Sequence, residues 1–69
     1  MKRQHVSSSV LASVGYDDEA HMLELEFHSG EIYEYFDVPP HVHDELMAAE
    51  SLGGYFARHI REQYPYERR

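Results

Sequence analysis

The sequence predicts a small α+β domain: a three-stranded antiparallel β-meander followed by two α-helices packed on one face of the sheet. Three observations support this. The first part of the chain alternates apolar and polar residues with a period of two. A double proline, Pro39-Pro40, ends that part. Beyond it, apolar residues recur at helical spacing, and strands followed by helices are the element order of an α+β fold.

The first predicted strand runs from about residue 8 to residue 16. Within it, Val10, Ala12 and Val14 alternate with Leu11, Ser13 and Gly15. The acidic stretch at residues 17–19 has the composition of a turn. It should join this strand to an antiparallel neighbour at about residues 22–28.

The second and third strands should form a β-hairpin. Leu23, Leu25 and Phe27 alternate with polar residues, as in a strand that is buried on one face only. Ser29-Gly30 follows and provides a turn, because glycine tolerates the positive φ that tight turns require. Residues 32–38 are rich in aromatic and β-branched side chains and should form the returning strand.

Two hairpin registers are open. A two-residue loop would pair His28 with Glu31 and would bury Glu34 on the leucine face. A three-residue loop with Gly30 as a bulge would pair Phe27 with Glu31. It would set Tyr33 and Tyr35 opposite Leu25 and Leu23. Because a slip of one residue turns every side chain to the other face, only one register can hold. We favour the bulged loop, since it keeps an unpaired carboxylate out of the core.

Two helices should follow the double proline. Val42, Glu45, Leu46 and Ala49 follow the i, i+3, i+4, i+7 spacing of a helix stripe, which predicts a helix from about Pro40 to Glu50. Proline suits the first turn of a helix, where its missing N–H has no intrahelical partner.

Ser51 can cap the second helix. Gly53 and Gly54 weaken its first turn but allow its backbone to approach another element closely. A stripe from Phe56 to Tyr64 continues it, and Pro65 ends it.

The 69 residues should form a single domain, with an ordered core at about residues 6–65 and flexible ends at residues 1–5 and 66–69. The chain contains no cysteine, which fits a cytoplasmic location and excludes disulfides and thiolate ligands. No apolar run approaches the roughly 18 residues of a membrane span, so no membrane partner is expected.

The chain is acidic, with thirteen acidic and six basic residues and a net charge of −7. This charge disfavours a nucleic-acid partner, because phosphate binding depends on lysine and arginine. All the basic residues lie near the two ends of the chain. The basic patch that the sequence offers would combine Arg58 and Arg61, three residues apart on one helix face, with the residues Lys2, Arg3, Arg68 and Arg69.

An ordered set of short motifs resembles the KTSC domain, a small module named for its occurrence at the C-terminus of some lysyl-tRNA synthetases and also found alone in small bacterial proteins. The resemblance covers Ser8 to about Tyr64. It rests on Val14-Gly15-Tyr16, the strand at residues 23–27, Gly30, Tyr33-Glu34-Tyr35, Val38-Pro39, Gly54-Tyr55-Phe56, Ile60 and Tyr64. The resemblance implies a small domain without catalytic residues, for which the synthetase context suggests RNA binding.

Four aromatic residues are candidates for binding. Tyr33 and Tyr35 could stack on bases, as aromatic pairs do on RNA-binding sheets, or pack under the helices with their hydroxyls at the rim. The neighbouring glutamates would repel a phosphate backbone, which favours core packing. Phe36 and Tyr55 are candidates for exposed contacts with another protein.

The histidines do not have the spacing of a metal site. His41 and His43 lie two residues apart on a helix and point in different directions, unlike the i, i+4 pair of a zinc-binding helix. The sequence also contains no nucleophile motif and no phosphate-binding loop. We therefore expect no metal, no cofactor, no small-molecule substrate and no enzymatic activity.

Two classes of function follow. The first is a protein-contact or self-association module that uses exposed aromatic residues. The second is an RNA- or tRNA-binding accessory domain that uses Arg58, Arg61 and the aromatic residues of the sheet.

Overall fold

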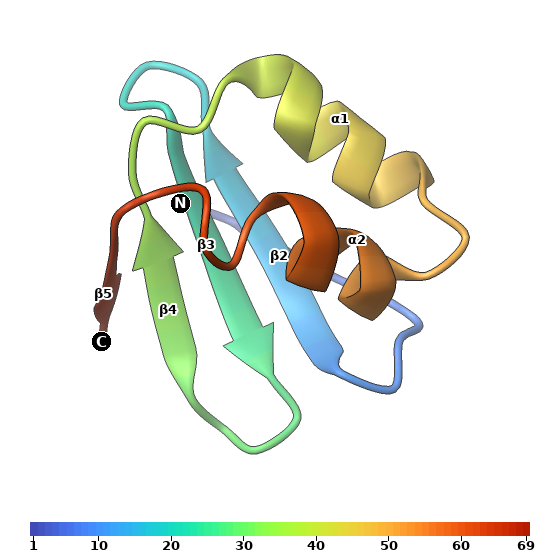
Figure 1. Ribbon diagram of the computed structural model, residues 1–69. Coiled ribbons are helices and arrows are strands. Elements are labelled where there is room, and N and C mark those ends of the chain that lie inside the picture. Colours follow the sequence, from blue (N-terminus) through green and yellow to red (C-terminus); the bar gives the residue numbers. More distant parts are fainter.

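The fold consists of one antiparallel sheet with both helices on the same face (Figure 1). The computed structural model describes all 69 residues. Five strands lie in the order β1-β2-β3-β4-β5. The elements along the chain are β1 (Arg3–His5), β2 (Leu11–Asp17), β3 (Met22–Phe27), β4 (Ile32–Tyr35), α1 (Pro40–Ala48), α2 (Leu52–His59) and β5 (Tyr66–Arg68).

The prediction of a three-stranded sheet was incomplete. The central strands β2, β3 and β4 form the expected meander, but the segments predicted as flexible ends add one strand at each edge. These edge strands are three residues long, too short for an alternating pattern to be recognisable. Each exists because a neighbouring strand, β2 or β4, offers a free row of backbone donors and acceptors.

The hairpin adopts the bulged register, as favoured from the sequence. Leu25 pairs with Tyr33 and Leu23 with Tyr35. The Phe27 amide donates to the Glu31 carbonyl over 2.9 Å, and Gly30 has a positive φ of 95°. Glu34 therefore lies on the outer face of the sheet, opposite Glu24.

Two strands are shorter than predicted. β4 ends at Tyr35 rather than Val38, because Asp37 takes a positive φ of 61° that bends the chain away from the sheet. β2 begins at Leu11 rather than Ser8. The Ser8 hydroxyl accepts hydrogen bonds from the amides of Val10 and Leu11, a local turn that competes with strand pairing.

The helices begin as predicted, and the second ends early. Pro40 occupies the first turn of α1, and the Ser51 hydroxyl caps α2 by accepting from the Gly54 amide over 3.0 Å. α2 stops at His59 instead of continuing to Tyr64. The amides of Ile60 and Arg61 both donate to the Phe56 carbonyl, and the second of these bonds closes a wider turn than that of an α-helix. This wide turn ends α2, and the chain returns to the sheet to form β5.

The core lies between the sheet and the helices. It is built from ten buried apolar residues: Leu11, Val14, Leu23, Leu25, Tyr35, Val38, Val42, Leu46, Phe56 and Ile60. Every central strand and both helices contribute to it. The opposite face of the sheet carries no helix (Figure 1).

Candidate functional site

An aromatic groove of about 860 Å³ lies between the β4–β5 end of the sheet and helix α2. Helices α1 and α2 lie over the β2 side of the sheet and leave the β4–β5 end open (Figure 1). Six aromatic residues line the groove: Phe27, Tyr33, Tyr35, Phe56, Tyr64 and Tyr66. A groove of this size and composition is typical of a site that takes up an apolar group.

The tyrosines of the two last strands form one wall of the groove. The Tyr66 ring lies 5.5 Å from that of Tyr33 and 5.4 Å from that of Tyr35, measured between centroids. Tyr35 is buried, Tyr33 is half-buried and Tyr66 is 54% exposed. The exposure of the wall therefore increases from the buried Tyr35 to the exposed Tyr66 on the adjacent strand.

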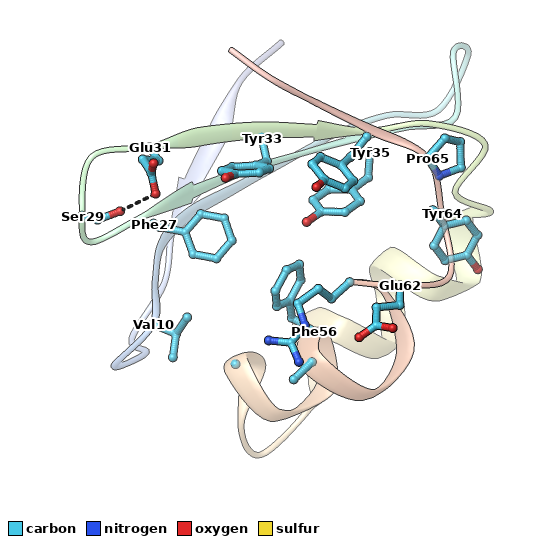
Figure 2. A pocket seen from close by; sticks show the side chains of 14 residues that line it. Val10, Phe27, Ser29, Glu31, Tyr33, Tyr35, Phe56, Glu62, Tyr64 and Pro65 are labelled. Carbon is cyan, nitrogen blue, oxygen red and sulfur yellow. Dashed lines mark hydrogen bonds between the residues drawn. The ribbon is translucent and has the colours of Figure 1, made fainter.

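Phe27 and Phe56 join this wall to the opposite one. The Phe56 ring of α2 meets both Phe27 and Tyr35 edge-on, at centroid distances of 5.4 and 5.7 Å. Figure 2 shows Phe27, Tyr33 and Tyr35 on one side of the opening and Phe56 on the other. Because these rings hold one another in place, the groove is preformed.

Two of the three large apolar side chains that are most exposed on this molecule border the groove. They are Tyr66, at 54% exposure, and Val10, at 41%. Val10 lies against the start of α2, where Gly53 has no side chain: a Cβ at that position would come within 2.8 Å of Val10 Cγ2. Gly53 was predicted to allow a close approach to another element, and the residue that approaches it is Val10.

The charges at the groove are few and of both signs. Arg61 and Glu62 are exposed and neither forms an ion pair, although both line the groove. Glu31 at the other end is held by Arg68, with 2.9 Å between Arg68 Nη2 and Glu31 Oε2. The groove therefore has an aromatic interior and a nearly neutral rim.

Burial raises the pKa of Tyr35 to about 12, and the neighbouring Tyr66 and Tyr33 add to this rise. The positive charge of Arg61 acts in the opposite direction. Tyr35 is thus a neutral phenol at physiological pH, and the groove gains no negative charge from it.

The groove brings together three of the six residues singled out in the sequence, Tyr33, Tyr35 and Arg61. Phe36, Tyr55 and Arg58 lie outside it. Phe36 is half-buried beyond the end of β4, and Tyr55 packs between the helices, where its hydroxyl donates to Glu45 Oε1 over 2.7 Å. The predicted Arg58–Arg61 pair is therefore divided, with only Arg61 at the groove.

Five residues that line the groove were not singled out in the sequence as binding residues: Val10, Phe27, Phe56, Tyr64 and Tyr66. The Phe56 stripe was assigned to a helix packed on the sheet, and Tyr66 to a flexible end. No local pattern shows that a three-residue strand at the C-terminal end carries Tyr66 to the side of Tyr33 and Tyr35.

A protein-family model described as the KTSC domain matches residues 7–64. The chain belongs to the KTSC domain family. The resemblance drawn from the sequence motifs is thereby confirmed. The match spans the strands β2, β3 and β4 and both helices, while β1 and β5 lie outside it.

Relatives of this KTSC domain occur alone and within larger proteins. An uncharacterised protein of Stutzerimonas stutzeri is 47% identical over 64 residues, which cover 93% of this chain and 90% of that protein. A lysine–tRNA ligase of a Nostoc species is 46% identical over 59 residues, 86% of this chain but only 10% of the ligase. The crystal structure of a KTSC domain protein from Yersinia pestis superposes with a TM-score of 0.96 at 37% identity, covering 99% of this chain and 96% of that one.

The outer face of the KTSC sheet is organised around a buried carboxylate that the sequence analysis did not single out. Glu24 in β3 has a side chain only 5% exposed. Arg3 Nη1 donates to one of its oxygens over 2.8 Å, and Arg69 donates to the other. The two ends of the chain therefore meet on one residue of the central strand, and two members of the predicted basic patch are neutralised there.

Two of the six histidines of this KTSC domain pack on tyrosines. The His43 ring stacks on Tyr16, with centroids 4.9 Å apart and planes 7° from parallel, and His59 lies against Tyr55 at 4.5 Å. No group of three or more histidine, aspartate or glutamate side chains is placed so that it could hold a metal ion. No helix has the length and apolar character needed to cross a membrane.

Proposed function

We propose that this KTSC domain is a protein-contact module whose aromatic groove takes up an apolar segment of another protein. The single observation that carries this proposal is the groove itself: about 860 Å³, lined by six aromatic residues and bordered by the exposed side chains of Val10 and Tyr66. An exposed aromatic surface in a small domain is a marker of an interaction site, because most apolar area is otherwise placed in the core.

The size of the groove supports a few anchoring side chains rather than a large flat interface. Rigid aromatic walls bind an apolar side chain with little loss of their own conformational freedom. A handful of such anchors supplies most of the binding energy in protein contacts. One or two apolar residues of a partner segment would therefore dominate the affinity.

The groove can be tested by filling it. Ala57 is exposed on α2 and lines the groove, so Ala57→Arg places a long charged side chain in it. Ala48 is an exposed residue at the end of α1 away from the groove, and Ala48→Arg is the matched control. Random twelve-residue peptides displayed on phage provide the probes, and fluorescence anisotropy measures the affinity of those selected.

We expect Ala57→Arg to weaken the selected peptides at least tenfold and Ala48→Arg to leave them unchanged. Peptides that bind both variants equally would place the contact elsewhere and overturn the proposal.

A second candidate function is RNA binding, and two observations favour it. Relatives include lysine–tRNA ligases, and Arg58 and Arg61 are exposed and free of carboxylate partners. Electrostatics oppose it, since three of the six basic side chains, Arg3, Arg68 and Arg69, are already paired with glutamates. Two remaining arginines would release few counterions from a phosphate backbone.

Labelled single-stranded RNA and tRNA, titrated at about 150 mM salt, decide between the two functions. The protein-contact proposal expects no binding in the micromolar range. Micromolar or tighter binding that is lost when Arg58 and Arg61 are both replaced by glutamate would establish the RNA-binding function instead.

A further inference from the structure

The outer edge of β5 offers free backbone hydrogen-bonding groups beside the groove. The Phe36 amide donates to the Pro65 carbonyl, and the Arg69 amide donates to the Ile32 carbonyl. Hydrogen-bonded and non-hydrogen-bonded pairs alternate along antiparallel strands, so Glu67 faces Glu34 in the hydrogen-bonded pair between these two. The N–H and C=O groups of Tyr66 and Arg68 therefore point away from β4.

Nothing in the molecule covers this edge. All three residues of β5 are exposed, and no further segment lies beyond the strand (Figure 1). Tyr66 and Arg68 pair with Tyr35 and Tyr33, so their side chains lie on the groove face, while Glu67 lies on the outer face. A strand placed alongside β5 would thus have alternate side chains directed towards the groove face.

We infer that the partner binds by strand addition: an extended peptide pairs with the free edge of β5 and directs every second side chain towards the aromatic groove. This inference rests on the proposed function and specifies how the partner is held. Up to four hydrogen bonds to Tyr66 and Arg68 would fix the peptide backbone. The groove would supply the selectivity for apolar side chains.

The charges around β5 define the partner further. Glu67 forms no ion pair and is exposed, so the peptide residue opposite it on the outer face should be lysine or arginine. The residues on either side of that one face Tyr66 and the methylene stem of Arg68, where apolar side chains pack best. The expected partner segment is apolar–basic–apolar, and the net charge of −7 attracts such a segment at long range.

A second copy of this chain fits the edge less well. Two β5 strands paired around a twofold axis, with Tyr66 opposite Arg68 of the other copy, would place Glu67 opposite Glu67. Like charges directly opposite one another destabilise a strand pair. The edge therefore selects a basic partner segment over self-association.

Backbone methylation of a bound peptide tests strand addition without altering the protein. A twelve-residue peptide selected from the phage library is synthesised with one N-methyl amide at each position in turn. We expect methylation at alternate residues of the central segment to weaken binding at least tenfold, with the residues between them tolerant. Selected peptides should also share the apolar–basic–apolar pattern.

A proline substitution tests the same edge from the side of the domain. The Arg68 amide points away from β4, so Arg68→Pro removes one outward donor while it spares the β4–β5 hydrogen bonds. Arg68→Ala is the matched control, since it removes the side chain only. We expect Arg68→Pro to bind the peptide at least tenfold more weakly than Arg68→Ala, with both variants folded by circular dichroism.

The outcomes separate this inference from the proposed function. A methylation scan without alternation, or equal binding by Arg68→Pro and Arg68→Ala, overturns strand addition while the loss of binding in Ala57→Arg would still support the groove. Peptides insensitive to Ala57→Arg overturn the groove itself. A doubling of the mass of the unliganded protein in light scattering, reversed by the peptide, would show that a second copy occupies the edge and would also overturn the inference.

Discussion

Glu24 shows how one residue fixes both ends of the chain. It lies in the central strand β3, and its buried carboxylate receives Arg3 from β1 and Arg69 from beyond β5. Gly15 makes room for this arrangement, because a Cβ there would come within 2.9 Å of Arg3 Cγ. The Glu24 carboxylate, on the face of the sheet that carries no helix, thus holds both edge strands through its two ion pairs.

The two sides of this ion-pair cluster should differ in their response to mutation. Arg3→Ala with Arg69→Ala leaves a buried carboxylate unpaired and should lower the free energy of unfolding by about 3 kcal/mol. Glu24→Gln leaves two arginines that can turn to water, since their side chains are 26% and 58% exposed, and should cost only about 1 kcal/mol. Urea denaturation measures both, and a larger loss in Glu24→Gln would contradict this account.

Tyr35 should make the domain sensitive to alkali. Its pKa is raised to about 12 in the folded protein, whereas an unfolded tyrosine titrates near 10. Between these values the unfolded chain loses the proton first, so stability is full below pH 10 and falls as the pH rises towards 12. Between pH 10 and pH 12, the free energy of unfolding should fall by about 1–3 kcal/mol less in Tyr35→Phe than in the wild type. Urea denaturation at pH 9 and pH 11.5 tests this, and parallel losses in the two proteins would refute it.

At the scale of the elements, the contact between α2 and the segment just before β2 depends on a missing side chain. Gly53 lies in the first turn of α2 against Val10, which precedes β2. A glycine inside a helix normally destabilises it by about 1 kcal/mol relative to alanine. Here the close approach to Val10 gives the glycine a packing role.

The effect of Gly53→Ala on stability should therefore depend on whether residue 10 is valine or alanine. In the wild type the added methyl meets Val10 Cγ2 at 2.8 Å, and we expect a net destabilisation of about 1 kcal/mol. In a Val10→Ala background the branched methyls are gone, and the helix propensity of alanine should make the same change neutral or stabilising. Thermal melts of the wild type, Gly53→Ala, Val10→Ala and the double variant complete a double-mutant cycle. Additive effects would show that the two residues are not coupled.

At the scale of the whole molecule, one small core carries the stability. Ten buried apolar residues join the strands and both helices in a chain of 69 residues, and a domain of this size has little reserve. The groove extends this core to the surface through Tyr33 and Tyr66. The proposed binding site and the folded core therefore share one aromatic cluster.

Leu25→Ala should threaten the fold as a whole. Leu25 is fully buried and pairs with Tyr33 across the hairpin, so its truncation should cost about 2–5 kcal/mol. The total stability of a small domain is of the same order. Val10→Ala removes an apolar side chain that is 41% exposed and should cost less than about 1 kcal/mol. Chemical denaturation compares the two, and equal losses would argue against a single core.

The sequence by itself determined the α+β class, the central meander and the two helix starts, and it favoured the hairpin register that the structure adopts. These are local properties: alternation over six residues, a glycine in a three-residue loop, a proline in the first turn and a serine cap each act within a few residues. The family also follows from short motifs, because they mark the same local elements. Tyr33 and Tyr35 were recognised as facing the helices for this reason.

Only the tertiary structure decided the two edge strands, the early end of α2, the groove and the role of Glu24. Each depends on segments far apart in the chain. The pairing of Arg69 with Glu24 spans 45 residues, and the ring contact between Tyr66 and Tyr33 exists only because β5 returns to the sheet. A three-residue strand has no periodicity of its own, so its place is set by the free hydrogen-bonding edge and the ion pair that it meets after the core has formed.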